Sequence, residues 1–375
     1  MLAEKSYLWA MKILEDLYTD FLLSSTRQTS ATVLSRLLDG VFSHDQISRL
    51  LNGEEQASKA LWQLVKPVVR AHETLDACLV FDDTIAEKEY TDENDLMCWH
   101  YDHSKGRSVR GVNLLTAFYV AQKEASAEAL RVPVAYELVT KPEVMCELAT
   151  KKVIRKSAVT KNEQMRSMIA QCIHNQLIFR YIIADSWFAS VENMKYIEGK
   201  NKKFIFDLKS NRLAQLATDS PAIPTKKSSW TSIKDLDLAA NTPTKVWLKD
   251  YDKVVLIVKQ VFKDEDGKVE GVRFLVTNDL NLSYNDIATI YKKRWSVEEY
   301  HKSIKQNASL TKSPTRTVKT QSNHIFYVLT AYIKLEKLKF ATHLNHFQLK
   351  AKLYLKATQA ALSELNAIKQ QYTTA

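Results

Sequence analysis

The chain has little of what would place it outside the ordinary globular proteins. Its 375 residues include only 7 glycines and 7 prolines, which is too few for a fibrous or low-complexity protein. It has no uncharged apolar run of about 18 residues, so we expect neither a membrane-spanning helix nor a membrane partner. The first 22 residues lack a cationic start followed by a clean apolar core, which predicts no signal peptide.

Cysteine is scarce and dispersed along the chain. No CxxC pair occurs among the four cysteines, which are Cys78, Cys98, Cys146 and Cys172. The sequence therefore signals neither a zinc site nor a disulfide framework. Free thiols of this kind suit a reducing compartment, and we expect a cytoplasmic location.

Positive charge, by contrast, is plentiful. There are 53 lysines and arginines against 43 acidic residues, a formal net charge of +10. Such an excess favours a polyanionic partner, although a merely basic enzyme would have the same composition. A hydrophobic content of 45% is ample for folding, and the length favours two or three domains.

The first part of the chain, residues 1–72, is predicted to be helical because its apolar residues recur at helical spacing. Within it, one short helix ends before Gly40, and Ser43 caps a second with Gln46 at the capping-box position. Two short helices joined in this way form either a DNA-binding helix-turn-helix or an ordinary helical hairpin. Arg49, the only cation on the second helix, is the candidate for contact with DNA.

From about residue 75 the pattern changes to buried strands alternating with helices, which predicts an α/β fold with a mixed sheet flanked by helices. A stretch of alternating polar and apolar residues with an Asp-Gly turn then predicts a β-rich insertion. The expected divisions are a core of 73–208 and 273–315, an insertion of 209–272 and C-terminal helices in 316–375.

Two apolar runs each lead into a carboxylate. Asp82 follows CLVF, and Asp185 follows YIIA. Acidic residues at the ends of buried strands are costly unless they are paired or bind a metal. Together with Glu298 they form a candidate site for hard divalent cations such as Mg²⁺, which prefer oxygen ligands.

A helical segment further along carries an unusual stripe. In the run YKKRWSVEEYHKSIK, offsets of 0, 3, 7 and 14 residues separate Tyr291, Arg294, Glu298 and Lys305. At about 100° per residue these side chains fall within a sector of about 60°. A helix that packs on a core would place aliphatic residues on such a stripe, so we interpret it as one wall of an active site that handles phosphates.

Three segments together resemble the DDE transposases of bacterial insertion sequences, specifically the insertion sequence 4 group. They are FDDT at 81–84, ADSWF at 184–188 and YKKRWSVEEYHKSIK at 291–305. The last is similar to the YREK signature of that group at all four positions and every spacing. The resemblance covers residues 75–310 and implies an RNase H-like catalytic core with a β-rich insertion between the second Asp and the Glu.

The resemblance also implies a catalytic triad of Asp82, Asp185 and Glu298 that holds two Mg²⁺ ions, or Mn²⁺ in their place. The pattern Asp-x-Thr selects Asp82, whereas an alignment with Asp directly before Thr84 selects Asp83. Neighbouring residues on a strand face opposite sides of the sheet, so only one of the two can be a ligand.

The remaining signature residues are expected to bind DNA. The resemblance implies that Tyr291, Arg294 and Lys305 contact phosphates near the cleaved end. Further positions found in some members are matched by Trp295, His301 and Lys302. For Trp295, burial in the core is an equal alternative.

One position departs from the pattern of members that form a DNA hairpin. Those members place a stacking Trp on the strand before the signature helix, where this chain has Arg273. Phe274 or Trp247 could supply a stacking surface instead. A basic loop earlier in the chain is either a DNA-backbone contact or simply solvated; its cations are Lys105, Arg107 and Arg110.

The function that the resemblance implies is transposition. Such a protein would bind terminal inverted repeats of double-stranded DNA, pair two ends as a homodimer, cleave them, and join the 3′-OH ends to target DNA. Two alternatives remain open at this point. One is a domesticated transposase that acts as a DNA-binding regulator, and the other is an RNase H-like nuclease without strand transfer.

Overall fold

Four helices form the N-terminal region, as the apolar periodicity predicts. The computed structural model describes residues 2–123, 128–148, 151–217 and 229–373, so part of the expected insertion, 218–228, lies outside the described residues. The helices are α1 (Leu2–Ser24), α2 (Ala31–Leu37), α3 (His44–Leu51) and α4 (Ser58–His72). Ser43 and Gln46 form the predicted capping box at the start of α3.

A large mixed sheet follows, which confirms the predicted α/β class. Among the described residues, 11 strands join in the order β10-β9-β11-β12-β13-β8-β7-β1-β3-β2, and β4 pairs with β3. Their bounds are β1 (Cys78–Glu87), β2 (Cys98–Asp102), β3 (Arg107–Ala121), β4 (Leu130–Leu138), β7 (Tyr181–Ala184), β8 (Lys203–Leu208), β9 (Leu213–Leu216), β10 (Thr231–Ser232), β11 (Thr244–Leu248), β12 (Val254–Lys263) and β13 (Val269–Thr277). A separate hairpin consists of β5 (Glu143–Glu147) and β6 (Lys152–Lys156).

The centre of the sheet is its parallel part. β7 runs parallel to both β1 and β8, and β3 is antiparallel to β1. Helices α5 (Lys161–His174) and α6 (Val191–Gly199) make the crossovers between the parallel strands. The apolar runs CLVF, YIIA and FIF are buried, as expected for central strands covered on both faces.

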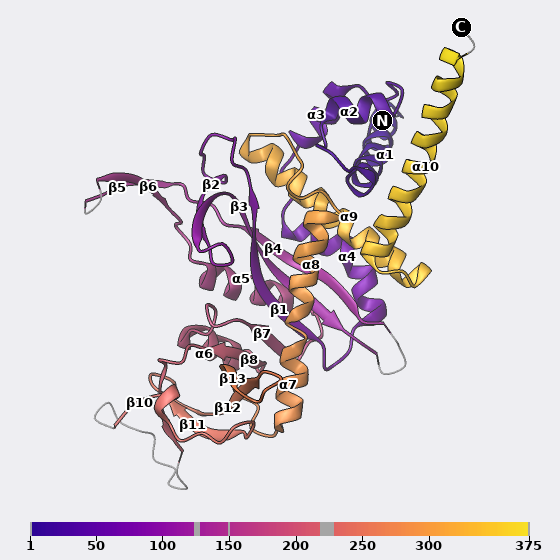
Figure 1. The fold of residues 1–375 in the computed structure, drawn as a ribbon. Helices are drawn as coiled ribbons and strands as arrows, with labels where there is room; N and C mark the ends of the chain where they lie inside the picture. Colours follow the sequence, from indigo (N-terminus) through magenta and orange to yellow (C-terminus); the bar gives the residue numbers. More distant parts are fainter. Residues whose placement is uncertain (1, 124–127, 149–150, 218–228, 374–375) are drawn as a thin grey trace.

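The opposite sides of this centre are covered by different helices. On one side, α8 (Trp295–Gln306) packs on β1, where the Tyr300 ring stacks on Phe118 of β3 at 4.6 Å between centroids. α5 packs against β3 and β4. Figure 1 shows α8 running alongside β1 with α7 (Tyr284–Lys292) at its end.

The signature segment differs from the single helix that its periodicity predicts. It is divided into α7 and α8 by a tight turn at Lys293 and Arg294. There the amide of Arg294 donates to the Tyr291 carbonyl at 2.9 Å, and the amide of Ser296 donates to the Lys293 carbonyl at 3.0 Å. Bonds between residues three apart wind the chain by about 120° per residue, so the predicted stripe is twisted at this point.

Strands β9 to β12 extend the sheet beyond β13, and β13 pairs with β8 next to the parallel centre. The predicted Asp266-Gly267 turn joins β12 to β13, and Gly267 has a φ of +78°, a value that suits glycine. A short 3₁₀ turn, η1 (Ile233–Asp235), follows β10. The extended part of the sheet lies at the opposite end from β2 and β4 (Figure 1).

Two long helices complete the chain, α9 (Val318–Thr342) and α10 (His346–Thr373). α9 packs against α1, α3 and α4, and these four elements are called the helical body below. α10 leaves this body and projects away from it (Figure 1). Among the described helices, none is both long and apolar enough to cross a membrane.

Candidate active site at the carboxyl ends of the parallel strands

Three carboxylates lie side by side where the parallel strands stop pairing. In the sheet register, Phe81 pairs with Ala184, and Ala184 pairs with Phe206. The residue after each of these is an aspartate, so that the row consists of Asp82, Asp185 and Asp207. Paired residues of parallel strands face the same side of a sheet, and the residues one step beyond them share the opposite side.

Asp207 was missed by the sequence analysis. Its segment KFIFD has the same form as CLVFD and YIIAD, an apolar run followed by an aspartate. The signal that pointed to Asp82 and Asp185 was therefore present at Asp207 as well, although Asp207 lies outside the three segments that carry the family resemblance.

The expected end of the first strand was wrong. β1 does not stop at Asp82 but continues to Glu87, and it pairs with β3 along its whole length. What ends after Phe81 is its pairing with β7. Asp82 is thus held by a continuous strand on one side and faces the end of β7 on the other.

Asp82 and Asp83 have different surroundings. The carboxylate of Asp83 accepts hydrogen bonds from the Asn113 amide and from Lys161 Nζ, each at 2.7 Å. Lys161 is the first residue of α5, on the other side of the sheet from α8. Asp82 pairs with Thr116, whose hydroxyl lies 3.4 Å from the Tyr300 hydroxyl of α8. Asp82 therefore shares the α8 side, whereas Asp83 is engaged on the α5 side.

One arginine connects the strands to the signature helix. The guanidinium of Arg294 contacts Glu298 Oε1 at 2.5 Å and Asp82 Oδ2 at 3.7 Å. Glu298 lies in the first turn of α8, so its side chain reaches the same cation as Asp82. The structure therefore brings Asp82, Arg294 and Glu298 together, with Asp185 next to Asp82.

Burial and like charge shape the ionisation of the aspartate row. The pKa of Asp82 is raised to about 7, mainly by burial and then by the neighbouring carboxylate of Asp185. Burial likewise raises the pKa of Asp185. Burial also raises the pKa of Asp207, against the opposing effect of Arg273. Holding ionised carboxylates this close carries an electrostatic cost, which a bound cation would relieve.

Arg273 and Tyr291 lie together at the Asp207 end of the row. The Arg273 guanidinium is 3.9 Å from Asp207 Oδ2 and lies over the Tyr291 ring at 5.6 Å from its centroid. Tyr291 is buried beneath it, and this burial raises the pKa of the phenol. Contact between the Tyr291 ring and a ligand therefore requires Arg273 to move.

The other predicted residues of α8 separate into exposed and buried positions. Trp295 is 61% exposed, which excludes the alternative that it belongs to the core. Lys302 is also exposed, with its ammonium 5.2 Å from the Phe347 ring centroid. Lys305 is half-buried, and this burial lowers its pKa. His301 is buried with a pKa lowered to about 3 by burial, so its ring does not reach the surface.

The two proposed substitutes for a stacking Trp are wrong. Phe274 is only 4% exposed and Trp247 only 8%, so neither offers a free ring face. In the basic loop, the ammonium of Lys105 pairs with Glu87, and Arg110 lies over the Trp99 ring at 5.8 Å from its centroid. Both cations are thus engaged within the protein.

The oxygen donors of these carboxylates are suitable ligands for a divalent cation, but the side chains are not arranged around a common metal position. Among the described residues, no group of three or more His, Cys, Asp or Glu side chains lies close enough to hold a metal ion. Glu298 is paired with Arg294, whose guanidinium already contacts two of the candidate ligands. The oxygen donors and the repulsion between Asp82 and Asp185 suit a hard cation such as Mg²⁺.

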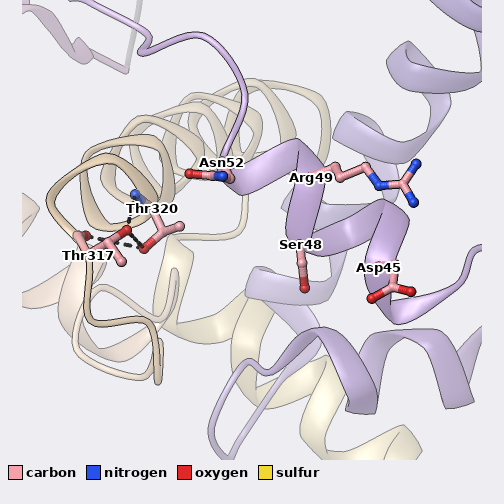
Figure 2. Close-up of a pocket in the computed structure, with 6 residues that line it drawn as sticks. All are labelled: Asp45, Ser48, Arg49, Asn52, Thr317 and Thr320. Carbon is pink, nitrogen blue, oxygen red and sulfur yellow. Dashed lines mark hydrogen bonds between the residues drawn. The ribbon is translucent and has the colours of Figure 1, made fainter.

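A second polar surface lies on the helical body. The outward side chains of α3 are exposed, and they include Arg49, the residue expected to contact DNA. An open cavity of about 440 Å³ is lined by Asp45, Ser48, Arg49, Asn52, Thr317 and Thr320. Figure 2 shows Asn52 beside Thr320 at the start of α9, whereas Arg49 points away from both threonines.

Comparison with known proteins identifies two overlapping families. Residues 135–334 match the family described as "Transposase DDE domain", and residues 10–234 match "DDE superfamily endonuclease". Each match covers more than half of the chain. The first contains Asp185 and Glu298, and the second contains Asp82 and Asp185. No curated protein matches the chain.

Proposed function

The chain belongs to the DDE transposases, enzymes that cleave DNA phosphodiester bonds and transfer the strands, and we propose that it is the transposase of a bacterial insertion sequence of the insertion sequence 4 group. In this proposal it acts in the cytoplasm as a homodimer that pairs two transposon ends. It cleaves at the terminal inverted repeats and joins the 3′-OH ends to target DNA. The observation that carries the proposal is the meeting of Asp82, Asp185 and the YREK-like segment around Arg294.

The topology supports an RNase H-like core as part of this proposal. The central strands run in the order β4-β3-β1-β7-β8, in which β3 is antiparallel to both of its neighbours, β4 and β1, whereas β7 and β8 run parallel to β1. Helical crossovers place the ends of β1 and β7 at one edge, where a site is expected. We assign this core to 73–208 and 273–315, the insertion to 209–272, DNA binding to 1–72 and the C-terminal helices to 316–375.

Asp82, Asp185 and Glu298 are the proposed catalytic residues and the ligands of two Mg²⁺ ions, which Mn²⁺ can replace. When bound, the cations supply charge stabilisation for the attacking and leaving oxygens of the phosphodiester. The row of aspartates supplies two ligands from neighbouring strands, and α8 supplies the third. Asp83 is left out of this set because Lys161 and Asn113 occupy its carboxylate.

The cations of the signature segment are the proposed contacts with the cleaved end. Arg294 lies at the carboxylate site, so a phosphate bound there would be close to the scissile bond. Lys305, Lys302 and Trp295 extend this surface along α8, and Arg273 with Tyr291 borders it at the Asp207 end. His301 would take part only after a rearrangement of α8, because its ring is buried.

End recognition is assigned to the helical body. The exposed face of α3 carries Arg49, and α2 precedes it as in a helix-turn-helix. Phosphate contacts elsewhere would position the duplex, whereas α3 would read bases. The cavity between α3 and the start of α9 lies next to this face (Figure 2).

One assay separates the proposed function from its two alternatives. The DNA flanking the gene is first searched for short inverted repeats, and a labelled end carrying such a repeat is incubated with the protein, Mg²⁺ and a supercoiled plasmid. Joined end-plasmid products support the transposase. Cleavage without joining identifies a nuclease, and specific binding without cleavage identifies a regulator.

A further inference from the structure

An exposed tryptophan stands directly beside the candidate site. Trp187 lies two residues after Asp185, in the turn between β7 and α6, and it is 50% exposed. Its backbone amide donates to Asp185 Oδ1 at 2.9 Å. The backbone that carries the indole is therefore held to a proposed catalytic carboxylate.

Two ammonium groups lie over the ring of this indole, as Arg273 lies over Tyr291, so a base stacks on a face that they cover only after they move aside. Lys161 Nζ and Lys209 Nζ each lie 5.8 Å from the centroid of the Trp187 ring. Lys161 comes from the start of α5 and also binds Asp83, whereas Lys209 directly follows β8. Three separate elements thus place one aromatic ring and two cations at the same spot.

Two further rings continue the aromatic surface. The His103 ring lies 5.9 Å from the Trp187 ring, and the Tyr101 ring lies 4.9 Å from His103. His103 and Tyr101 are both exposed. They belong to β2 and to the turn that leads into β3, so the surface extends from the end of β7 to the basic loop.

The chemistry of this surface suits an unpaired nucleotide. A flat aromatic ring offers a stacking face to any base, and flanking ammonium groups attract the phosphates on either side. Bases inside an intact duplex are already stacked on their neighbours and have no free face. An exposed Trp between two lysines therefore fits a strand whose bases have been separated from the partner strand.

We propose that Trp187, flanked by Lys161, Lys209 and His103, is a stacking site for an unpaired nucleobase next to the scissile phosphate. This inference rests on the proposed function, because it takes the strand processed at Asp185 to be DNA. The stacked base holds the strand open at the site, so that the phosphate beside it is presented to the carboxylates. The role is one of positioning, and it adds no chemical step.

The test measures binding without divalent metal, so that cleavage does not interfere. Two DNA probes share a sequence: a blunt duplex, and the same duplex with unpaired nucleotides at its end that include 2-aminopurine. Wild-type protein is expected to bind the second probe more tightly and to quench its fluorescence through stacking. Trp187→Ala should weaken that binding by about fivefold to 100-fold and abolish the quenching. Binding of the blunt duplex should change by less than about twofold.

The controls separate stacking from general damage. Tyr354→Ala removes an exposed aromatic ring of α10, 60% exposed, and should behave as wild type on both probes. Trp187→Phe should retain part of the preference and the quenching because the smaller ring still stacks. Lys209→Ala tests the flanking charge and should weaken binding of the unpaired probe while leaving the quenching of bound DNA in place. Thermal melting of each variant verifies its fold.

The results on the two probes distinguish an incorrect stacking site from an incorrect proposed function. If the wild-type protein cleaves end DNA, and Trp187→Ala binds and quenches the unpaired probe as wild type does, the stacking site is overturned and the transposase proposal stands. If the wild-type protein binds neither probe, both are overturned. Loss of binding to both probes in a folded Trp187→Ala variant would make Trp187 a general DNA contact and would also overturn the stacking site.

Discussion

The sheet site and the helical body both bury polar side chains, but they surround them with different neighbours. In the sheet site, Asp82, Asp185 and Asp207 stand in a row with two arginines around them. In the helical body the buried carboxylate of Glu336 on α9 is paired with Lys339 and His346, and other buried polar groups are neutral with hydrogen-bond partners. The Tyr18 hydroxyl lies 3.0 Å from His324 Nδ1, and the Asn323 amide donates to the Leu51 carbonyl at 2.9 Å.

This difference separates groups that stabilise the fold from groups that serve a ligand. A buried neutral group with a hydrogen-bond partner costs little and fixes the packing of the helices around it. Burial of a carboxylate, together with like charges beside it, opposes folding, as the raised pKa of Asp82 indicates. Such an arrangement is typical of a site that binds a cation or reacts, which agrees with membership of the DDE transposases.

The largest effect is expected from a matched pair of neighbours in β1. Asp82→Asn should reduce cleavage by about 10⁴-fold or more, because a ligand is lost, while the free energy of unfolding stays equal or rises. Asp83→Asn should keep cleavage but lose about 1–3 kcal/mol of stability, because the charged bonds to Lys161 and Asn113 are weakened. Cleavage rates measure the loss of activity, and urea unfolding measures the change in stability, of both variants. The reverse pattern would make Asp83 the first ligand.

The next effect concerns pH, where the two regions should respond in opposite directions. Burial lowers the pKa of His324 from 6.5 to about 3. Between these two pH values the histidine is protonated in the unfolded chain and neutral in the folded chain. Its stabilising contribution is full above pH 6.5 and is lost as pH falls toward 3, on the order of a few kcal/mol. The pKa of Asp82 is raised to about 7 from 3.8, so its contribution is instead lost as pH rises through that range.

Unfolding free energies of two variants between pH 4 and 7.5 would separate these contributions. On acidification, the stability of His324→Gln relative to wild type should rise, whereas the stability of Asp82→Asn relative to wild type should fall. Relative stabilities that change in the same direction for both variants would contradict the opposite signs of the two pKa shifts. Saturating Mg²⁺ should reduce the stability advantage of Asp82→Asn over wild type, because Asp82 is a proposed metal ligand. It should leave the stability difference between His324→Gln and wild type unchanged.

A smaller effect is expected on the face of α3. Arg49→Ala should weaken binding of the inverted repeat by about 1–3 kcal/mol if the guanidinium reads a guanine, and the melting temperature should not change. Lys356→Ala, which removes an exposed cation of α10, serves as the control. Fluorescence anisotropy with the repeat and with a scrambled duplex gives the specificity. An equal loss on both duplexes would assign Arg49 to the phosphate backbone.

The smallest effect lies in the salt dependence of end binding. Arg294→Ala and Lys305→Ala should each reduce the slope of log K against log salt by about 0.9, the value for one lost phosphate contact. Glu298→Gln should leave this slope unchanged while cleavage falls below detection. Titrations at several salt concentrations, in the absence of divalent metal, provide the slopes. An unchanged slope for Arg294→Ala would mean that this guanidinium serves the carboxylates and does not bind DNA.

Much of the framework could be predicted from the sequence because its signals are local. Apolar runs and their periods identified the buried strands and the helices, and Ser43 with Gln46 identified a helix start. The Asp-Gly pair at 266–267 identified the turn between β12 and β13. The spacing of Tyr291, Arg294 and Glu298 marked the signature segment. Each signal depends on residues close together in the chain, whose steric and hydrogen-bonding preferences act at short range.

What only the tertiary structure decided concerns faces and neighbours. The register of β1, β7 and β8 placed Asp207 beside Asp185, and the positions of α5 and α8 separated Asp83 from Asp82. Packing also buried His301, Phe274 and Trp247 and left Trp187 exposed. A residue's own sequence neighbourhood specifies its strand or helix, but long-range pairing determines which charges meet and which rings remain free, because these contacts join segments far apart in the chain.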